Sequence, residues 1–207
     1  MSNRLAIAAV TATLQDLLTV AAAEVPGTAV IVGRPDSKRQ AEPTPTINLF
    51  LFDVLNNPSL RNQHQPSRNF EGNLLDTPTA ALDLHYLLTF TGRESALESQ
   101  RLLGATIAAL VEHPVLTPDD ITRSMGLRDY LAGCDLATAD DRVRLSPLHL
   151  SLEELSRLWS MLAQEPYAIS LQYQASVVVV NPTVTPRRVE PVTVENITVS
   201  PIERRPR

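Results

Sequence analysis

Cysteine, glycine, lysine and aromatic residues are scarce in this chain, and each scarcity excludes a class of site or core. The 207 residues include one cysteine, Cys134, which excludes an intrachain disulfide and a cysteine-clustered metal site. Seven scattered glycines are too few for a loop that cradles phosphate groups. Four Phe, four Tyr and one Trp leave a core that must be mainly aliphatic, and 16 prolines indicate stiff connections.

Charge is distributed unevenly along the chain. The net charge is −5. Residues 1–180 carry 13 basic and 20 acidic groups (−7), whereas residues 181–207 carry five Arg and three Glu (+2). Because nucleic-acid affinity depends largely on neutralising phosphates with basic groups, the acidic part predicts no nucleic-acid partner.

Long apolar runs are also absent. No stretch approaches the ~20 apolar residues that span a bilayer. Residues 4–10 resemble the start of a secretion signal, but Gln15 and Asp16 interrupt it where the apolar segment should continue. Apolar residues at three- and four-residue steps instead predict an amphipathic helix over residues 3–23, capped by Ser2. Its predicted inward residues are Ile7, Val10, Leu14, Leu17, Leu18 and Ala21. We therefore expect a soluble protein without a signal peptide or a membrane partner.

Strands are predicted from alternating or β-branched segments. The period-two pattern is cleanest over residues 81–91, where Leu84, Tyr86 and Leu88 share one face. Residues 47–55 carry large apolar groups on both faces until Asp53, which predicts a central strand covered on two sides. Further strands are predicted at 28–32, 142–145 and 167–180.

Three further helices are predicted from apolar periodicity and capping residues. The first covers residues 94–112, with inward residues Leu97, Leu103, Ile107, Leu110 and Val111. Another begins at Thr117 with a proline and two aspartates in its first turn and extends toward Leu131, although Gly126 weakens it. The last begins with a capping box at Ser151. Its predicted inward residues are Leu152, Leu155, Leu158, Trp159 and Leu162.

These elements do not alternate strictly, which favours an α+β fold: a mainly antiparallel mixed sheet packed with three to four helices. We expect a single domain over residues 1–180 and an extended, Pro/Val/Thr-rich C-terminal arm over residues 181–207. The arm is either a loose terminus or a segment that adds a strand to a neighbouring sheet. The loop over residues 56–80 is long for a compact domain, which is typical of a binding loop.

Enzyme motifs are missing from the sequence. There is no nucleotide-binding glycine pattern, no nucleophile elbow and no His-Glu-x-x-His zinc motif. His85, with Asp83 two residues away on the same face, is the one arrangement that resembles a base and its orienting carboxylate, and a surface histidine without a catalytic role explains it better. Cys134 is flanked by Asp135, which raises a thiol pKa. We expect no catalytic residue, no cofactor and no metal.

Several segments together resemble the cap, or tail-terminator, proteins of extracellular contractile injection systems of the antifeeding-prophage type. The segments are residues 49–54 (LFLFDV), 56–57, 60–62, 84–89, 102–104, 151–154, 158–159 and 167–173. Their order and spacing carry the resemblance, which covers residues 1–180 and not the arm. The chain has Phe52 where the family often has tyrosine.

The resemblance implies a structural role in a phage-tail-like particle. A homo-hexameric ring would seat on the inner tube and the last sheath layer and end their growth, with no cofactor or catalytic residue. Such a protein is made in the cytoplasm and becomes part of the particle. The interface candidates are residues of the long loop and the arm, namely Asn56, Arg61, Asn62, Arg68, Arg187, Arg188, Val192, Val194, Ile197 and Val199.

Two other functions stay open at this point. A soluble adaptor would dock its arm into a partner sheet by strand addition. A small unrecognised enzyme would use His85 and Asp83 beneath the loop 56–80. Truncation of the arm separates the adaptor from the ring protein, because a ring built from residues 1–180 would still assemble.

Overall fold

A computed structural model of the chain describes residues 3–35, 44–60, 79–162 and 165–181. Four α-helices and five strands lie in the described part of the chain, together with three short 3-10 helices. In chain order they are α1 (Ala6–Ala22), β1 (Ala29–Val32), β2 (Thr46–Asn56), β3 (Ala80–Thr91), η2 (Glu94–Ala96), α2 (Glu98–Glu112), α3 (Pro118–Gly126), η3 (Asp129–Leu131), η4 (Leu136–Thr138), β4 (Arg144–Pro147), α4 (Leu152–Met161) and β5 (Ile169–Val180).

The strands form one five-stranded sheet in the order β1-β2-β3-β5-β4. Only β1 and β2 are parallel, and the other three pairs are antiparallel. This confirms the predicted α+β class with a mainly antiparallel mixed sheet. The centre of the sheet is β3, so the prediction that residues 47–55 form a central strand holds only in part. β1 pairs with β2 at residues 46–49 alone.

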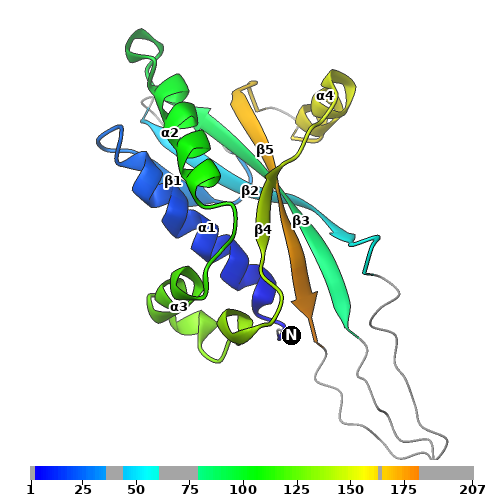
Figure 1. Cartoon of the computed structure of the whole chain (residues 1–207). Helices are drawn as coiled ribbons and strands as arrows, with labels where there is room; N and C mark the ends of the chain where they lie inside the picture. Colours follow the sequence, from blue (N-terminus) through cyan, green and yellow to red (C-terminus); the bar gives the residue numbers. More distant parts are fainter. Residues whose placement is uncertain (1–2, 36–43, 61–78, 163–164, 182–207) are drawn as a thin grey trace, which may run out of the picture.

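The main core lies between one face of the sheet and the helices α1, α2 and α3, which Figure 1 shows on the same side. The alternation predicted for β3 supplies this face, because Leu84, Tyr86, Leu88 and Phe90 are all buried there. Tyr86 is fully buried, and its hydroxyl lies 2.8 Å from the Thr11 hydroxyl of α1. Burial raises the pKa of Tyr86 well above its ordinary range.

The opposite face of the sheet is covered by α4 alone among the described helices, and Figure 1 shows α4 apart from the other three. A small separate cluster of Leu87, Leu158 and Leu162 joins α4 to β3, with Phe50 and Phe52 of β2 packed against it. The prediction that β2 is covered on two sides is therefore confirmed. Elsewhere on this face, Gln172 and Gln174 of β5 are only half-buried.

Helix α1 begins later than the sequence indicated. Its first residue is Ala6 rather than residue 3, and its N-cap, Leu5, makes no side-chain capping bond. The Asn3 side chain instead accepts a hydrogen bond from the Leu5 amide. The predicted cap, Ser2, lies outside the described residues. Val10, Leu14 and Leu18 are buried as predicted, whereas Ile7, Leu17 and Ala21 are half-buried.

Helix α2 turns a different face to the core from the one predicted. Its start is Glu98, after η2, because Leu97 adopts the left-handed conformation (φ 51°) and interrupts the helix. The buried residues are Glu98, Leu102, Thr106 and Leu110. Leu97, Ile107 and Val111 are exposed, so the predicted inward face is wrong except at Leu110 and the half-buried Leu103.

The turn before α2 is held by one carboxylate. Glu98 is almost fully buried, and its oxygens accept hydrogen bonds from the backbone amide and the guanidinium of Arg93. These bonds lower the pKa of Glu98. A Cβ on Gly92 would lie 2.7 Å from the Glu98 Cβ, so this close approach needs glycine. The turn therefore fixes the position of the exposed Leu97 on the surface.

The capping box predicted at Ser151 is present, and the cap predicted at Thr117 also forms a capping box. Thr117 and Asp120 cap α3, and Ser151 and Glu154 cap α4, each pair with reciprocal side-chain to backbone bonds. α3 ends at Gly126 instead of continuing to Leu131, and β4 begins two residues later than predicted. Leu152, predicted to point inward, is 84% exposed. No helix in the described part of the chain is sufficiently long and apolar to cross a membrane.

Candidate assembly interface

The long loop and the C-terminal arm leave the body at the same end of the sheet. Asn56, the last residue of β2, pairs with Leu82, and Ala80 pairs with Val180, the last residue of β5. Figure 1 shows the start of β3 and the end of β5 side by side. We call this region, residues 53–57, 80–85 and 178–181, the arm end. Two predicted interface segments are thus anchored within one small region.

Of the predicted interface residues, the structure describes Asn56 alone. Its side chain is exposed at the arm end. The others lie outside the described residues, namely Arg61, Asn62, Arg68, Arg187, Arg188, Val192, Val194, Ile197 and Val199. Their roles stay predictions.

The arm end is organised by Asn57, which the sequence did not single out for this role. Its side-chain amide donates to both carboxylate oxygens of Asp83, at 3.0 and 3.1 Å. Its side-chain oxygen accepts from the amides of Ser59 and Leu60, and its own amide donates to the Ala81 carbonyl. One residue therefore fixes the direction in which the chain leaves β2. An Asn after a strand is an ordinary turn signal, but its partner Asp83 could not be inferred from the sequence.

His85 faces a different carboxylate from the one expected. Its Nδ1 lies 3.7 Å from Asp53 Oδ2 across the β2–β3 pair, while Asp83 is bonded to Asn57. The hypothetical pair of His85 and Asp83 therefore does not form in the structure. An irregularity in register between Leu51 and Asp53 accounts for the change, because it shifts the strand by one residue and sets Asp53 opposite His85.

The outer edge of β2 lacks a strand partner beyond Leu49 in the part of the chain that the structure describes, because β1 pairs with residues 46–49 only. Val54 and Leu55, at the far end of β2, are 42% and 47% exposed. An edge with unpaired backbone groups and exposed apolar side chains is suited to contact with another chain.

A second surface with exposed apolar side chains lies on the helices. Ile107 and Val111 project from the outer face of α2, and Val20 from α1. Single exposed apolar residues are ordinary, but α2 carries two apolar stripes, of which only one is used by the core. The second stripe, which includes Ile107 and Val111, is visible in the sequence as apolar periodicity, and for that reason it was predicted to face the core.

A groove beside α4 forms a third surface, at the end of the sheet where β5 begins. Leu152, Leu155 and Trp159 line it from α4, and Tyr167 closes it from the segment before β5. The rings of Trp159 and Tyr167 lie 5.2 Å apart, and Tyr167 is 70% exposed. We call this the α4 groove. It is lined by Leu152, Leu155, Ser156, Trp159, Ser160, Glu165 and Tyr167. Tyr167 also lines a neighbouring hollow that contains Leu97.

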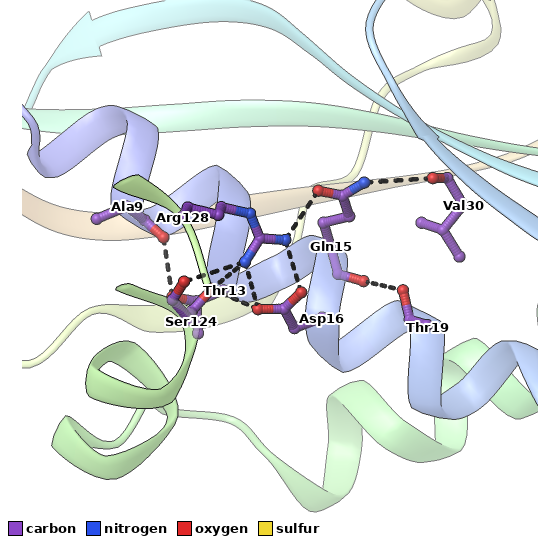
Figure 2. A network of polar contacts seen from close by, with 8 residues as sticks. All are labelled: Ala9, Thr13, Gln15, Asp16, Thr19, Val30, Ser124 and Arg128. Atoms are coloured by element: carbon purple, nitrogen blue, oxygen red, sulfur yellow. Dashed lines mark hydrogen bonds and ion pairs between the residues drawn. The ribbon is translucent and has the colours of Figure 1, made fainter. Parts of the chain in front are cut away.

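A network of charged and polar groups holds the helices in place. Figure 2 shows the Arg128 guanidinium against Asp16, with bonds of 2.7 and 2.6 Å to the two carboxylate oxygens. Ser124 also donates to Asp16, and Arg128 donates to Gln15, whose amide reaches the Val30 carbonyl of β1. The network therefore joins the segment after α3 to α1 and to the sheet.

The charge of Asp16 contributes to stability in a pH-dependent way. Partial burial raises the pKa of Asp16, but the hydrogen bonds from Arg128 and Ser124 outweigh it and hold the pKa below 3.8. A lowered folded-state pKa stabilises the fold above pH 3.8, and this stabilisation is lost as the pH falls through the lowered value. We expect Asp16→Asn to lower the free energy of unfolding by about 1–2 kcal/mol at pH 7, after discounting for partial exposure, and by less at pH 3.

Urea unfolding at the two pH values measures this difference. Asp140→Asn is the matched control, because Asp140 is exposed and its replacement should change the free energy of unfolding by less than about 0.5 kcal/mol. An equal loss at pH 7 and pH 3 for Asp16→Asn would show that its charge plays no part.

The described residues contain no cluster of His, Cys, Asp and Glu that could hold a metal ion. Cys134 is buried, and burial together with the Asp135 charge raises the pKa of its thiol. This agrees with the direction predicted from Asp135 and describes an unreactive thiol. Within residues 3–35, 44–60, 79–162 and 165–181, the features that stand out are therefore the three contact surfaces.

Comparison with known proteins places these surfaces in context. Residues 9–194 match the Pvc16 N-terminal domain family, so the match runs past residue 180 and ends within the predicted arm. By sequence, no curated protein matches the chain.

Two solved structures share the fold. One is the sheath/tube terminator of the extracellular contractile injection system PVC in its extended state, with a TM-score of 0.59 and 18% identity over 95% of this chain. The other is the cap of the anti-feeding prophage, described as the AFP tube terminating cap, with a TM-score of 0.54 and 20% identity over 89% of this chain. The chain spans 64% and 59% of their respective lengths.

Proposed function

The chain belongs to the Pvc16 N-terminal domain family, and we propose that it is a terminator: a ring of six copies that binds the end of an inner tube and the last sheath layer of a contractile injection particle and stops their growth. The observation that carries this proposal is the shared fold, which covers 95% of the chain and belongs in one case to a sheath/tube terminator. The role needs contact surfaces and no chemistry.

The distribution of contact surfaces supports a ring subunit. Such a subunit presents different complementary patches to its two neighbours and further surfaces to the polymer it caps. The surplus apolar stripe of α2, the α4 groove and the arm end lie on different parts of the body. In a monomer these three surfaces would have no partner subunit to cover them.

The arm is part of the same proposal. We assign residues 1–180 to the ring body and residues 181–207 to an extension that contacts other subunits. Its β-prone segment, which includes Val192, Val194, Ile197 and Val199, is suited to adding a strand to a neighbouring sheet. Asn56 lies at this end of the body, and we propose that it and the loop residues Arg61, Asn62 and Arg68 contact the tube or sheath.

The charge of the assembly favours a particle without a genome. Six copies of a chain with net charge −5 carry about −30, and such a ring repels phosphate. We propose accordingly that the ring binds no nucleic acid. The same structural role includes no enzymatic activity and no membrane partner.

The test of this proposal measures mass and tube length. The purified full chain, alone or mixed with tubes, should form a species of about six copies, and particles made without it should have tubes of uncontrolled length. His85→Ala should assemble normally, because the proposal gives His85 no catalytic role. A protein that stays monomeric in the presence of tube ends, together with normal tube lengths in its absence, would contradict the proposal.

A further inference from the structure

We propose that the α4 groove of each subunit binds the Pro186-Arg187-Arg188 segment of the arm of a second copy. This inference deepens the proposed function and rests on it, because it concerns the contact between neighbouring copies in the ring. It follows from three features: the apolar and aromatic lining of the groove, the net negative charge of residues 151–167, and the reach of the arm.

The lining of the groove suits a proline-containing segment. Leu152, Trp159 and Tyr167 present a concave apolar surface in which the two rings meet at a tilt of 53°, and Leu152 is 84% exposed. Proline-containing segments favour the extended polyproline II conformation, which packs into aromatic-lined grooves at a low entropic cost. The arm begins with prolines at positions 182, 186 and 191.

An unpartnered donor lies at the base of this surface. The indole Nε1–H of Trp159 is shielded from water and has no acceptor among the described residues. A buried donor without an acceptor destabilises a protein, because it has lost its hydrogen bonds to water. A small rotation of the indole toward a main-chain carbonyl of a bound segment would supply the acceptor.

The charge of the segment around the groove is opposite to that of the arm. Residues 151–167 carry three glutamates and one cation, Arg157, for a net charge of −2. Glu153 is paired with Arg157 and Glu154 caps α4, so the attraction for the arm comes from the net charge of the segment. The side chain of Glu165 lines the groove itself. The arm carries adjacent arginines directly after Pro186, and arginine both pairs with carboxylates and stacks on aromatic rings.

The reach of residues 181–188 shows whether the arm can bind the groove of its own subunit or only that of a neighbouring subunit. β5 runs for 12 residues from Ile169, beside the groove residue Tyr167, to Val180 at the arm end. At ~3.3 Å per residue this strand spans about 36 Å. The eight residues from Asn181 to Arg188 reach at most roughly 29 Å from Val180 when fully extended. The segment therefore falls short of its own groove, and a second copy must supply the partner.

Mixing experiments with the full chain test the proposed contact directly. One population carries Leu152→Cys and the other Val189→Cys; the native Cys134 is buried and its thiol pKa is raised. Under mild oxidation of rings assembled from the mixture, we expect a disulfide-linked pair that contains one chain of each kind. Replacing Val189→Cys by Ser200→Cys, also in the arm, should reduce the yield at least fivefold. Rings of normal mass without the mixed pair would overturn the proposal.

The role of the arginines has its own matched control, because the arm carries a second adjacent pair, Arg204 and Arg205. Trp159 is the only tryptophan, so its fluorescence reports the groove specifically. The change in Trp159 emission on ring formation should be lost with R187E/R188E and kept with R204E/R205E. An equal effect of both double variants would contradict recognition of this segment.

A peptide experiment separates failure of this inference from failure of the proposed function. A synthetic peptide of residues 181–192, added to the full chain carrying R187E/R188E, should shift Trp159 emission, and Tyr167→Ala in that chain should weaken binding at least tenfold. Peptide binding by a chain that never forms rings would refute the ring and retain the groove. Rings that form while the peptide fails to bind would refute the groove and retain the terminator, with a tube or sheath segment as the remaining occupant.

Discussion

Replacing Leu102 by alanine is expected to lower the free energy of unfolding by about 2–5 kcal/mol, since truncation of a fully buried leucine loses apolar contacts and leaves a cavity. Leu102 lies at the centre of the buried face of α2, one turn from Glu98 and from Thr106. Denaturant unfolding followed by circular dichroism measures the effect.

The control for this prediction is on the same helix. Ile107 is 40% exposed, and Ile107→Ala should lower the free energy of unfolding by less than about 1 kcal/mol while weakening assembly of the ring. The two variants thus separate the stripe of α2 that holds the fold from the stripe left over for contact. Equal destabilisation by both would mean that the helix is rotated relative to the structure described above.

Replacing Leu158 by aspartate is expected to detach α4 and leave the main core intact. Leu158 and Leu162 are the buried residues by which α4 joins the sheet, and burial of each leucine contributes about 1.5–3 kcal/mol. A carboxylate at position 158 removes this contact. A helix of 10 residues is marginal on its own in water, so the detached α4 should unfold.

Hydrogen exchange followed by mass spectrometry measures this local opening. Amides of residues 152–161 should exchange at least 100-fold faster in Leu158→Asp, whereas those of α1 should keep their protection. Met161→Asp is the control, because Met161 lies on the same helix and is 75% exposed. Equal loss of protection in α1 would show that the two hydrophobic clusters unfold as one unit.

The sheet was predictable because its strands carry strong local patterns. The alternation in β3 and the two-sided apolar character of β2 predicted both strands to within one residue at each end. The pairing of Asp53 with His85 was not predictable, since it depends on a one-residue irregularity in the register of β2 and β3. A pattern of period two cannot reveal where a strand gains an extra residue.

The helices show the limits of periodicity more clearly. α2 carries apolar residues on two adjacent stripes, and the stripe through Leu102 and Leu110 packs on the core because the Glu98–Arg93 contact fixes the rotation of its first turn. A carboxylate that is nearly fully buried at a helix start is not expected from its residue type. The sequence therefore predicted the helix correctly and most of its inward residues wrongly.

The predicted interface residues stay predictions, because Asn56 alone among them lies in the described part of the chain. The loop and arm were identified by their composition, and the structure brings their anchor points together at residues 56, 80 and 180. The α4 groove was missed, because a capping box at Ser151 followed by leucines favours a helix that buries all of them. The cluster between α4 and the sheet has only three buried residues, so Leu152 is not part of it and stays exposed to solvent.

The position of β5 within the sheet governs how the body would respond to tension. β5 is flanked by β3 along its length and by β4 in its middle, and the polypeptide continues from its last residue into position 181. A pull on the chain beyond that point acts along the strand axis, at right angles to the cross-strand hydrogen bonds. These bonds would then be loaded in shear and would have to break together rather than one after another, which gives the subunit a mechanically strong point of attachment.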